Sequence, residues 1–291
     1  MKRIGIIPNE FKDKGLVCTS TVLDYLSAKE CVVHISDEYE SILPKKIRAN
    51  IFFIEKKEVF SRSDILITIG GDGTILEVSH HAAAGDIPIL GINLGTVGFM
   101  TEIEVGETEL LDALFTSEYS VENRMMLDIE LIRDCKTIGL YHALNDVVLF
   151  KGVVSKLIEI NFFCNDTLAT TYRADGLIVA TPTGSTAYSL SAGGAVIDPG
   201  IEALCVTPIS SHAFLNSFPM VYSAENVLVL EIARERDDSV YLSSDGMENI
   251  KILFGDKIVI RRSELSTKLI RIKNTGFYEA VYKKLPERGK A

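Results

Sequence analysis

The stretch from residue 65 to residue 76 constrains the fold most, because a short apolar run passes at once into a cluster of glycines. Residues 65–69 (Ile-Leu-Ile-Thr-Ile) are rich in β-branched side chains, which is typical of a parallel strand buried on both faces. Glycines surround one carboxylate in the next five residues, and a periodic pattern from Thr74 to about Ala84 predicts a helix. The sequence therefore predicts a buried strand, a tight turn and a helix.

A turn of this composition can hold phosphate. Backbone N–H groups in a glycine turn, together with a helix N-terminus, form a site for anionic oxygens. Asp72 is the odd member, because a carboxylate repels phosphate; its presence suggests binding of Mg²⁺, a hydrogen bond to a sugar hydroxyl, or removal of a proton from a nucleophile. The turn alone fits equally well with a plain strand-to-helix connection that has a capping aspartate.

The first part of the chain alternates strands and helices. Strands are predicted at residues 4–7, 30–35 and 87–92, with helices at 19–29 and 107–117, so we expect an α/β domain with a Rossmann-like parallel sheet. A second glycine turn follows at residues 95–100, at the carboxyl edge where ligands of such sheets bind. Phe99 in this turn would cover a base or sugar, or belong to the core.

From Tyr119 onward the pattern changes to successive strands. Strands are predicted at residues 127–133, 141–150, 156–164, 167–172, 227–233, 240–243 and 257–262. A final strand at 269–272 and a helix at 277–285 are expected to return to the first domain. We therefore expect an α/β domain at 1–118 and 266–291, and a β-rich domain at 119–265.

Composition limits the possible partners and the compartment. A net charge of −10 and a pI near 5.1 disfavour nucleic acid and anionic membranes as partners. The five cysteines show no C-x-x-C spacing, so neither a disulfide framework nor a zinc cluster is expected. No apolar run is long enough to span a membrane, and the chain starts without a signal-peptide pattern, so we expect a soluble cytoplasmic protein.

Two further motifs lie in the β-rich domain. Asn145 and Asp146 put an amide beside a carboxylate in an otherwise apolar run, which indicates either a site at a strand end or a polar turn. Residues 173–194 combine hydroxyl groups, one tyrosine and several glycines, which suits the base, sugar and phosphates of a nucleotide. Walker, H-E-x-x-H, G-x-S-x-G and G-x-G-x-x-G motifs are all missing from the sequence.

With Gly-Gly-Asp-Gly-Thr, Asn145-Asp146 and the 173–194 block in this order, nearly the whole chain resembles the bacterial NAD kinases. The first motif alone is shared with diacylglycerol and sphingosine kinases and, loosely, with phosphofructokinases, whereas the Thr-Pro-Thr-Gly-Ser-Thr-Ala-Tyr block is specific. The resemblance implies transfer of a phosphoryl group from ATP, another nucleoside triphosphate or polyphosphate, with a divalent metal such as Mg²⁺, to the adenosine ribose 2′-hydroxyl of NAD, giving NADP. It also implies homodimers or homotetramers whose subunits share sites.

The resemblance assigns roles to particular residues. Asp72 would accept the hydroxyl proton, and no dedicated set of protein ligands is expected for the metal. The loop for the donor phosphates would consist of Gly70, Gly71, Gly73 and Thr74. The contacts to NAD would come from Asp72, Gly73, Phe99, Asn145, Asp146, Lys156, Arg173, Asp175, Thr186, Ala187, Tyr188, Ser189, Leu190 and Ser191.

Two departures from the family pattern keep other functions open. Met247 stands where many relatives have glutamine after Asp-Gly, and Phe218 stands where an arginine often precedes proline, near the phosphates. These departures suggest a non-catalytic NAD- or NADP-binding sensor as an alternative, although a pure binder has little need for Asp72 in a phosphate loop. A lipid kinase is the other alternative, and the polar loop at 181–191 argues against it.

Overall fold

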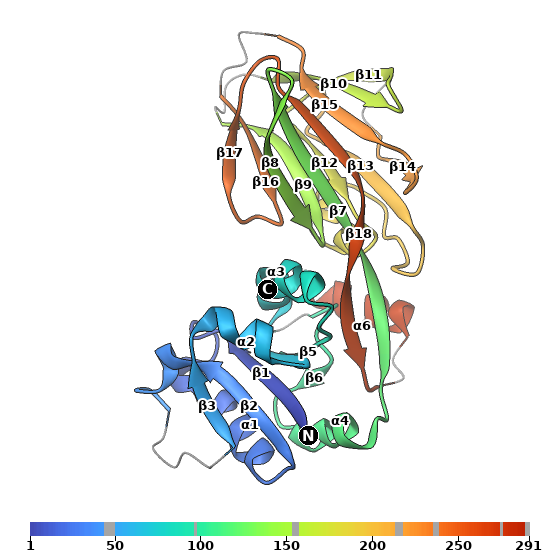
Figure 1. Cartoon of the computed structure of the whole chain (residues 1–291). Helices are drawn as coiled ribbons and strands as arrows, with labels where there is room; N and C mark the ends of the chain where they lie inside the picture. Colours follow the sequence, from blue (N-terminus) through green and yellow to red (C-terminus); the bar gives the residue numbers. More distant parts are fainter. Residues whose placement is uncertain are drawn as a thin grey trace. The chain divides into compact units, whose positions relative to one another are not determined.

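The computed structural model describes residues 1–43, 50–95, 98–152, 157–212, 218–234, 239–273 and 276–288. The chain forms two compact units, the first made of Met1–Asn123 with Thr267–Ala291, and the second of Arg124–Ser266 (Figure 1).

The first unit is built on a parallel sheet. Its strands lie in the order β3-β2-β1-β4-β5, and β5 also pairs in parallel with β6 and with the end of β18. The strand bounds are β1 (Lys2–Pro8), β2 (Cys31–Ser36), β3 (Ile51–Ile54), β4 (Ile65–Gly70), β5 (Ile89–Asn93) and β6 (Ile103–Glu104). Every residue of β4 is buried, as expected for a central strand covered on both faces.

Helices of the first unit pack on this sheet. Helix α1 contacts β2, α2 contacts β1 and β2, and α3 contacts β4 and β5 (Figure 1). The bounds are α1 (Val17–Ser27), α2 (Lys56–Arg62), α3 (Asp72–Ala84), α4 (Ala113–Thr116) and α6 (Phe277–Arg288). Branched aliphatic side chains from β1, β2, β4 and β5, together with Val22 and Leu26 of α1, form one core cluster.

The second unit contains two antiparallel sheets. One has the order β14-β13-β12-β9-β16-β17, and the other joins β11, β10, β15, β18, β7 and β8. The bounds are β7 (Ser120–Arg133), β8 (Lys136–Ala143), β9 (Asp146–Lys151), β10 (Ile158–Cys164), β11 (Thr167–Ala174), β12 (Gly176–Ala180), β13 (Ala203–Ile209), β14 (Met220–Ser223), β15 (Leu228–Ile232), β16 (Val240–Ser244), β17 (Asn249–Ile252) and β18 (Lys257–Arg271). Residues from both sheets form one apolar core, centred on aliphatic side chains and Phe162.

The structure confirms the predicted combination of an α/β unit and a β-rich unit, and it corrects three local predictions. Residues 141–150 are not one strand, because Leu144 and Asn145 form a turn between β8 and β9. The strands predicted at 257–262 and 269–272 are parts of the single strand β18. The helix predicted at 107–117 is a 3₁₀ segment, Thr108–Asp112, followed by the single turn α4.

Within the part of the chain that the structure describes, no helix combines the length and apolar character needed to cross a membrane. The five cysteines are all free thiols.

Candidate functional site

The glycine turn lies where the sheet order of the first unit reverses. Strands β1 and β4 are neighbours at the centre of the sheet, and their chains continue into α1 and α3. Ligands of open α/β sheets bind outside the carboxyl ends of the strands at such a switch point. Gly70, the last residue of β4, must be glycine, because a Cβ there would lie 2.1 Å from Thr74 Oγ1.

Hydrogen bonds between residues of the turn cap the N-terminus of helix α3. Gly71 N–H donates to Thr74 Oγ1 (3.4 Å), and Thr74 N–H donates to the Gly71 carbonyl (2.9 Å). The N–H groups of Gly71 and Thr74, two residues of the loop predicted for the donor phosphates, are therefore already engaged. Gly73 lies in the first turn, where N–H groups have no partner inside the helix, and it is exposed.

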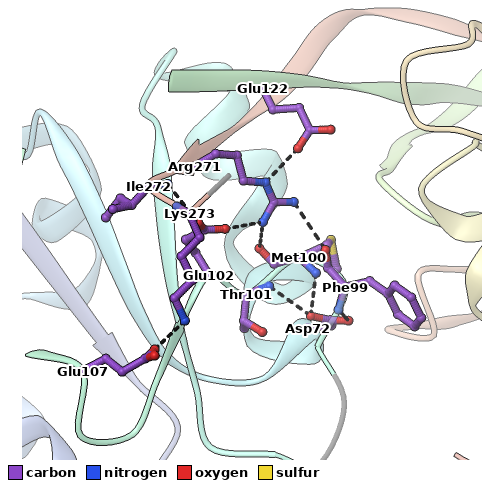
Figure 2. Close-up of polar contacts among 10 residues, drawn as sticks. All are labelled: Asp72, Phe99, Met100, Thr101, Glu102, Glu107, Glu122, Arg271, Ile272 and Lys273. Carbon is purple, nitrogen blue, oxygen red and sulfur yellow. Dashed lines mark hydrogen bonds and ion pairs between the residues drawn. The ribbon is translucent and has the colours of Figure 1, made fainter. Parts of the chain in front are cut away.

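Asp72 is held by the second glycine turn. Its Oδ2 accepts the N–H of Phe99 (2.8 Å), and its Oδ1 accepts those of Met100 (3.0 Å) and Thr101 (3.4 Å), as Figure 2 shows. The backbone of Phe99 makes this contact, and its side chain is partly exposed. The carboxylate therefore has a fixed position at the start of α3.

Lys12 also lies at the glycine turn, and sequence reasoning missed it. Its Nζ is 2.7 Å from the point that a Cβ on Gly71 would occupy. Asn9 links this region to the turn, because its backbone N–H donates to the Ile69 carbonyl (2.8 Å), its side-chain amide donates to Thr74 Oγ1 (3.2 Å), and its Oδ1 accepts the Lys12 N–H (3.1 Å). The position of Lys12 just after the first strand was the available signal.

The second unit contains a pocket of about 440 Å³. This volume is within the usual range for small-molecule sites. It is lined by Asn145, Asp146, Val148, Phe150, Ala187, Tyr188, Ser243, Asp245, Gly246 and Asn249. Four predicted substrate residues, Asn145, Asp146, Ala187 and Tyr188, thus meet in one pocket, with Tyr188 46% exposed.

Asp245 shapes this pocket by holding the turn before β9. Its carboxylate accepts the N–H groups of Leu144 (2.7 Å), Asn145 (2.8 Å) and Asp146 (3.0 Å). From the other side, Gly184 packs so tightly that a Cβ would lie 2.0 Å from the Asn145 carbonyl oxygen. The side-chain Oδ1 of Asn145 is buried and has no hydrogen-bond partner, so it is available to a donor on a ligand.

Burial raises the pKa values of two carboxyl groups in this pocket. Burial, and secondarily the negative charge of Asp245, raises the pKa of Asp146 to about 7. Burial also raises the pKa of Asp245, although its three backbone hydrogen bonds act in the opposite direction. Near neutral pH the Asp146 carboxyl can therefore either accept or donate a hydrogen bond.

The rest of the predicted 186–191 run is occupied with internal contacts. Ser189 is fully buried, and its hydroxyl bonds Thr207 Oγ1 (2.9 Å). Thr186 Oγ1 donates to the Thr183 carbonyl (3.2 Å), and Ser191 Oγ donates to that of Ala187 (3.4 Å). Thr186, Ser189, Leu190 and Ser191 do not line the pocket described above.

The remaining predicted residues lie elsewhere in the second unit. Asp175 forms an ion pair with Lys151. Arg173 is exposed, and its carbonyl accepts the His212 N–H (3.0 Å). Lys156 lies outside the described residues. Of the two departures from the family pattern, Met247 and Phe218 are both about half exposed, 49% and 56%, and neither lines the pocket.

These features together define a class. A parallel α/β unit with an acidic glycine turn at its switch point, joined to a β-rich unit that contains a small-molecule-sized pocket, is an arrangement that suits a nucleotide-dependent phosphotransferase.

Comparisons with known proteins give the family. Residues 4–119 match the ATP-NAD kinase N-terminal domain, and residues 144–272 match the ATP-NAD kinase C-terminal domain. The chain is 40% identical over 290 residues to an NAD kinase of Thermoanaerobacter sp. (strain X514), covering 99% of this chain and 100% of that protein. It is 41% identical, again over 99% and 100% of the two chains, to an NAD kinase of Caldanaerobacter subterraneus subsp. tengcongensis. The chain belongs to the ATP-NAD kinase family, so the resemblance predicted from the motifs is confirmed.

Solved structures agree with this assignment. Yeast NADH kinase, crystallised with NADH, superposes with a TM-score of 0.87 at 25% identity, covering 100% of this chain and 89% of that one. An NAD kinase from Archaeoglobus fulgidus, in complex with ATP, superposes with a TM-score of 0.71 at 24% identity, covering 98% of each chain, and supports the fold.

Proposed function

We propose that this chain is an NAD kinase, which transfers the γ-phosphoryl group of ATP, or a phosphoryl group of another nucleoside triphosphate or of polyphosphate, to the 2′-hydroxyl of the adenosine ribose of NAD. Family membership supports the reaction. The observation that carries it in the structure is the fixed carboxylate of Asp72 within the glycine turn at the switch point.

Asp72 would act as the general base. Its Oδ2 accepts a single backbone N–H, which leaves capacity to accept the proton of the ribose hydroxyl. The deprotonated oxygen would then attack the γ-phosphorus, and the bond from phosphorus to the β–γ bridging oxygen would break to release ADP and NADP. The hydrogen bonds to Phe99 and Met100 hold the base in place for this step.

The donor phosphates would lie over the first turn of α3. The N–H of Gly73 and the positive end of the helix dipole favour anionic oxygens there. We infer that Lys12, whose ammonium lies against Gly71, adds the positive charge that the Phe218 departure removes from the family pattern.

A divalent metal, Mg²⁺, is the proposed cofactor. We expect the ion to be bound mainly by phosphate and water, as is usual for Mg²⁺ in nucleotide sites. When bound, the ion would neutralise charge on the transferred phosphoryl group.

The pocket of the second unit would hold the adenosine of NAD. The unpartnered Oδ1 of Asn145 suits an amino or hydroxyl donor, and Asp146 can match either a donor or an acceptor. Tyr188 offers an exposed aromatic face for stacking. The assignments of Phe99, Lys156, Arg173, Asp175 and residues 186–191 to NAD remain part of this proposal.

Assembly and location are also proposed. We expect a homodimer or homotetramer in which subunits share sites. A cytoplasmic location agrees with five free thiols, which are typical of a reducing compartment.

The test is to incubate the protein with NAD, ATP and Mg²⁺ and to measure NADP by an NADP-specific dehydrogenase. We expect NADP from the wild type and a loss of about 10²-fold or more in Asp72→Asn. Replacing ATP with polyphosphate, and NAD with NADH, would establish the substrate range. The proposal is wrong if no donor yields NADP, or if Asp72→Asn is as active as the wild type.

A further inference from the structure

The segment that holds Asp72 is itself held from its opposite side. Arg271, at the end of β18, donates from Nη1 to the Met100 carbonyl (3.1 Å) and from Nη2 to the Phe99 carbonyl (3.3 Å). Figure 2 shows the guanidinium and the Asp72 carboxylate on either side of this segment. Arg271 thus reaches the backbone that positions the base, and it does so without bonding the base directly.

The hydrogen bonds from Arg271 and those to Asp72 are made by the same two peptide groups. The Phe99 carbonyl and the Met100 N–H belong to the same peptide group, and so do the Met100 carbonyl and the Thr101 N–H. Each of these two planar groups accepts from Arg271 and donates to Asp72 Oδ1. Hydrogen bonds connected in this way polarise and strengthen one another.

Arg271 is in turn fixed by carboxylates. Its Nε donates to Glu122 Oε2 (2.8 Å), and its Nη1 also donates to Glu102 Oε2 (3.1 Å). The other oxygen of Glu102 accepts the N–H groups of Ile272 (2.9 Å) and Lys273 (2.6 Å). The side chains of Arg271 and Glu102 are only 18% and 8% exposed, so little freedom is left to the guanidinium.

We propose that Arg271 is a positioning residue for Asp72, acting through the two peptide groups between Phe99 and Thr101. This inference rests on the proposed function, in which Asp72 is the base. A base in proton transfer must be held within a fraction of an ångström of its productive position. A residue contributed by the end of the chain therefore sets the rate of a reaction that takes place at the glycine turn.

Two substitutions at Arg271 and one control test this role. Arg271→Met removes the donors, and Arg271→Lys keeps the charge but not the planar pair of donors. The control is Lys268→Met. Lys268 also belongs to β18, and its replacement breaks an ion pair with Asp86 but leaves the segment at 99–101 untouched.

The first measurement is hydrogen exchange of the amides of Phe99, Met100 and Thr101, followed by mass spectrometry or NMR. We expect at least about 10-fold faster exchange in Arg271→Met than in the control, with an intermediate rate in Arg271→Lys. This readout does not depend on turnover. If the wild type made no NADP while exchange rose as expected, the proposed function would fail and the positioning of the carboxylate by Arg271 would stand.

The second measurement is steady-state kinetics. We expect kcat to fall about 10- to 100-fold in Arg271→Met, with KM values for NAD and ATP within about threefold of the wild type, and partial recovery in Arg271→Lys. If Arg271 acts by positioning the base, its replacement matters little once the base is gone, so in an Asp72→Asn background Arg271→Met should lower kcat by about twofold or less. A merely structural defect would instead lower kcat equally in both backgrounds. Wild-type exchange rates in Arg271→Met, or an equal fall of kcat in the Lys268→Met control, would overturn the inference.

Discussion

Replacing Gly73 by alanine should separate stability from activity. A Cβ at this position meets no atom within 4 Å, and the residue does not have a positive φ. It is the second residue of α3, where alanine is favoured over glycine by about 0.5–1 kcal/mol. With about 2–4 °C of melting temperature per kcal/mol for a domain of this size, we expect Tm to rise by about 1–4 °C.

The same methyl group would stand where we propose that the donor phosphates approach the helix. We expect kcat/KM for ATP to fall about 10- to 100-fold, because a displacement of about 1 Å is enough to disturb phosphoryl transfer. NAD affinity, measured by calorimetry, should fall less than kcat/KM for ATP, because Gly73 does not line the pocket of the second unit in which the adenosine is proposed to bind.

Gly276→Ala is the matched control. Gly276 also has open space around the position of a Cβ and no positive φ, but it precedes α6. It should leave kcat/KM for ATP unchanged. If Gly73→Ala retained wild-type kcat/KM for ATP while Tm rose, the donor phosphates would not lie over Gly73, and the proposed donor site would be refuted.

Three further outcomes are expected. Because burial raises the pKa of Asp146 to about 7, the folded chain keeps a proton that the unfolded chain releases near pH 4. As pH rises from 5 to 8, this carboxyl should therefore lower the free energy of unfolding by roughly 2–3 kcal/mol. In thermal melts Asp146→Asn should remove this dependence on pH, and an unchanged dependence would contradict the raised pKa. Lys12→Gln should raise KM for ATP about 10-fold, since a charge-assisted contact to phosphate is lost; an unchanged KM would exclude Lys12 from the donor site. Gly184→Ala should lower Tm and weaken NAD binding in calorimetry, because its methyl group would displace the backbone of Asn145. A wild-type Tm would show that this backbone can shift at little cost in stability.

The central features of the fold were predictable because their signals are local. The apolar run at 65–69 and the glycines after it specify a buried strand and a tight turn without help from the rest of the chain, and β4 and α3 lie there. The predicted helix start at Thr74 was two residues late, because Gly71 caps a helix that already begins at Asp72.

Features that depend on distant partners were not predictable. The break between β8 and β9 at Leu144 requires Asp245, a residue about a hundred positions further along, to accept the N–H groups of the turn. The continuity of β18 was hidden by the polar residues between its two apolar parts.

The site shows the same limit. The resemblance assigned Asn145, Asp146 and Tyr188 to NAD, and in the structure all three line one pocket. Hydroxyl content alone could not show that Ser189 faces Thr207 inside the protein. The roles we infer for Lys12 and Arg271 depend on contacts between separate segments, and no pattern of spacing reports such contacts.

The course of β18 has a consequence for synthesis on the ribosome. Leu269 pairs with Ile89 of β5, and Ile270 is buried in the core of the first unit, so this part of β5 has no such neighbour until residue 269 has left the exit tunnel. Domains near the N-terminus usually fold before later ones are made. Here the unit whose translation begins first is completed after the second unit, and the segment that holds Asp72 gains its contacts to Arg271 only after residue 271 has been translated. A nascent chain stalled before residue 269 would carry the glycine turn without the hydrogen bonds from Arg271 to the Phe99 and Met100 carbonyls.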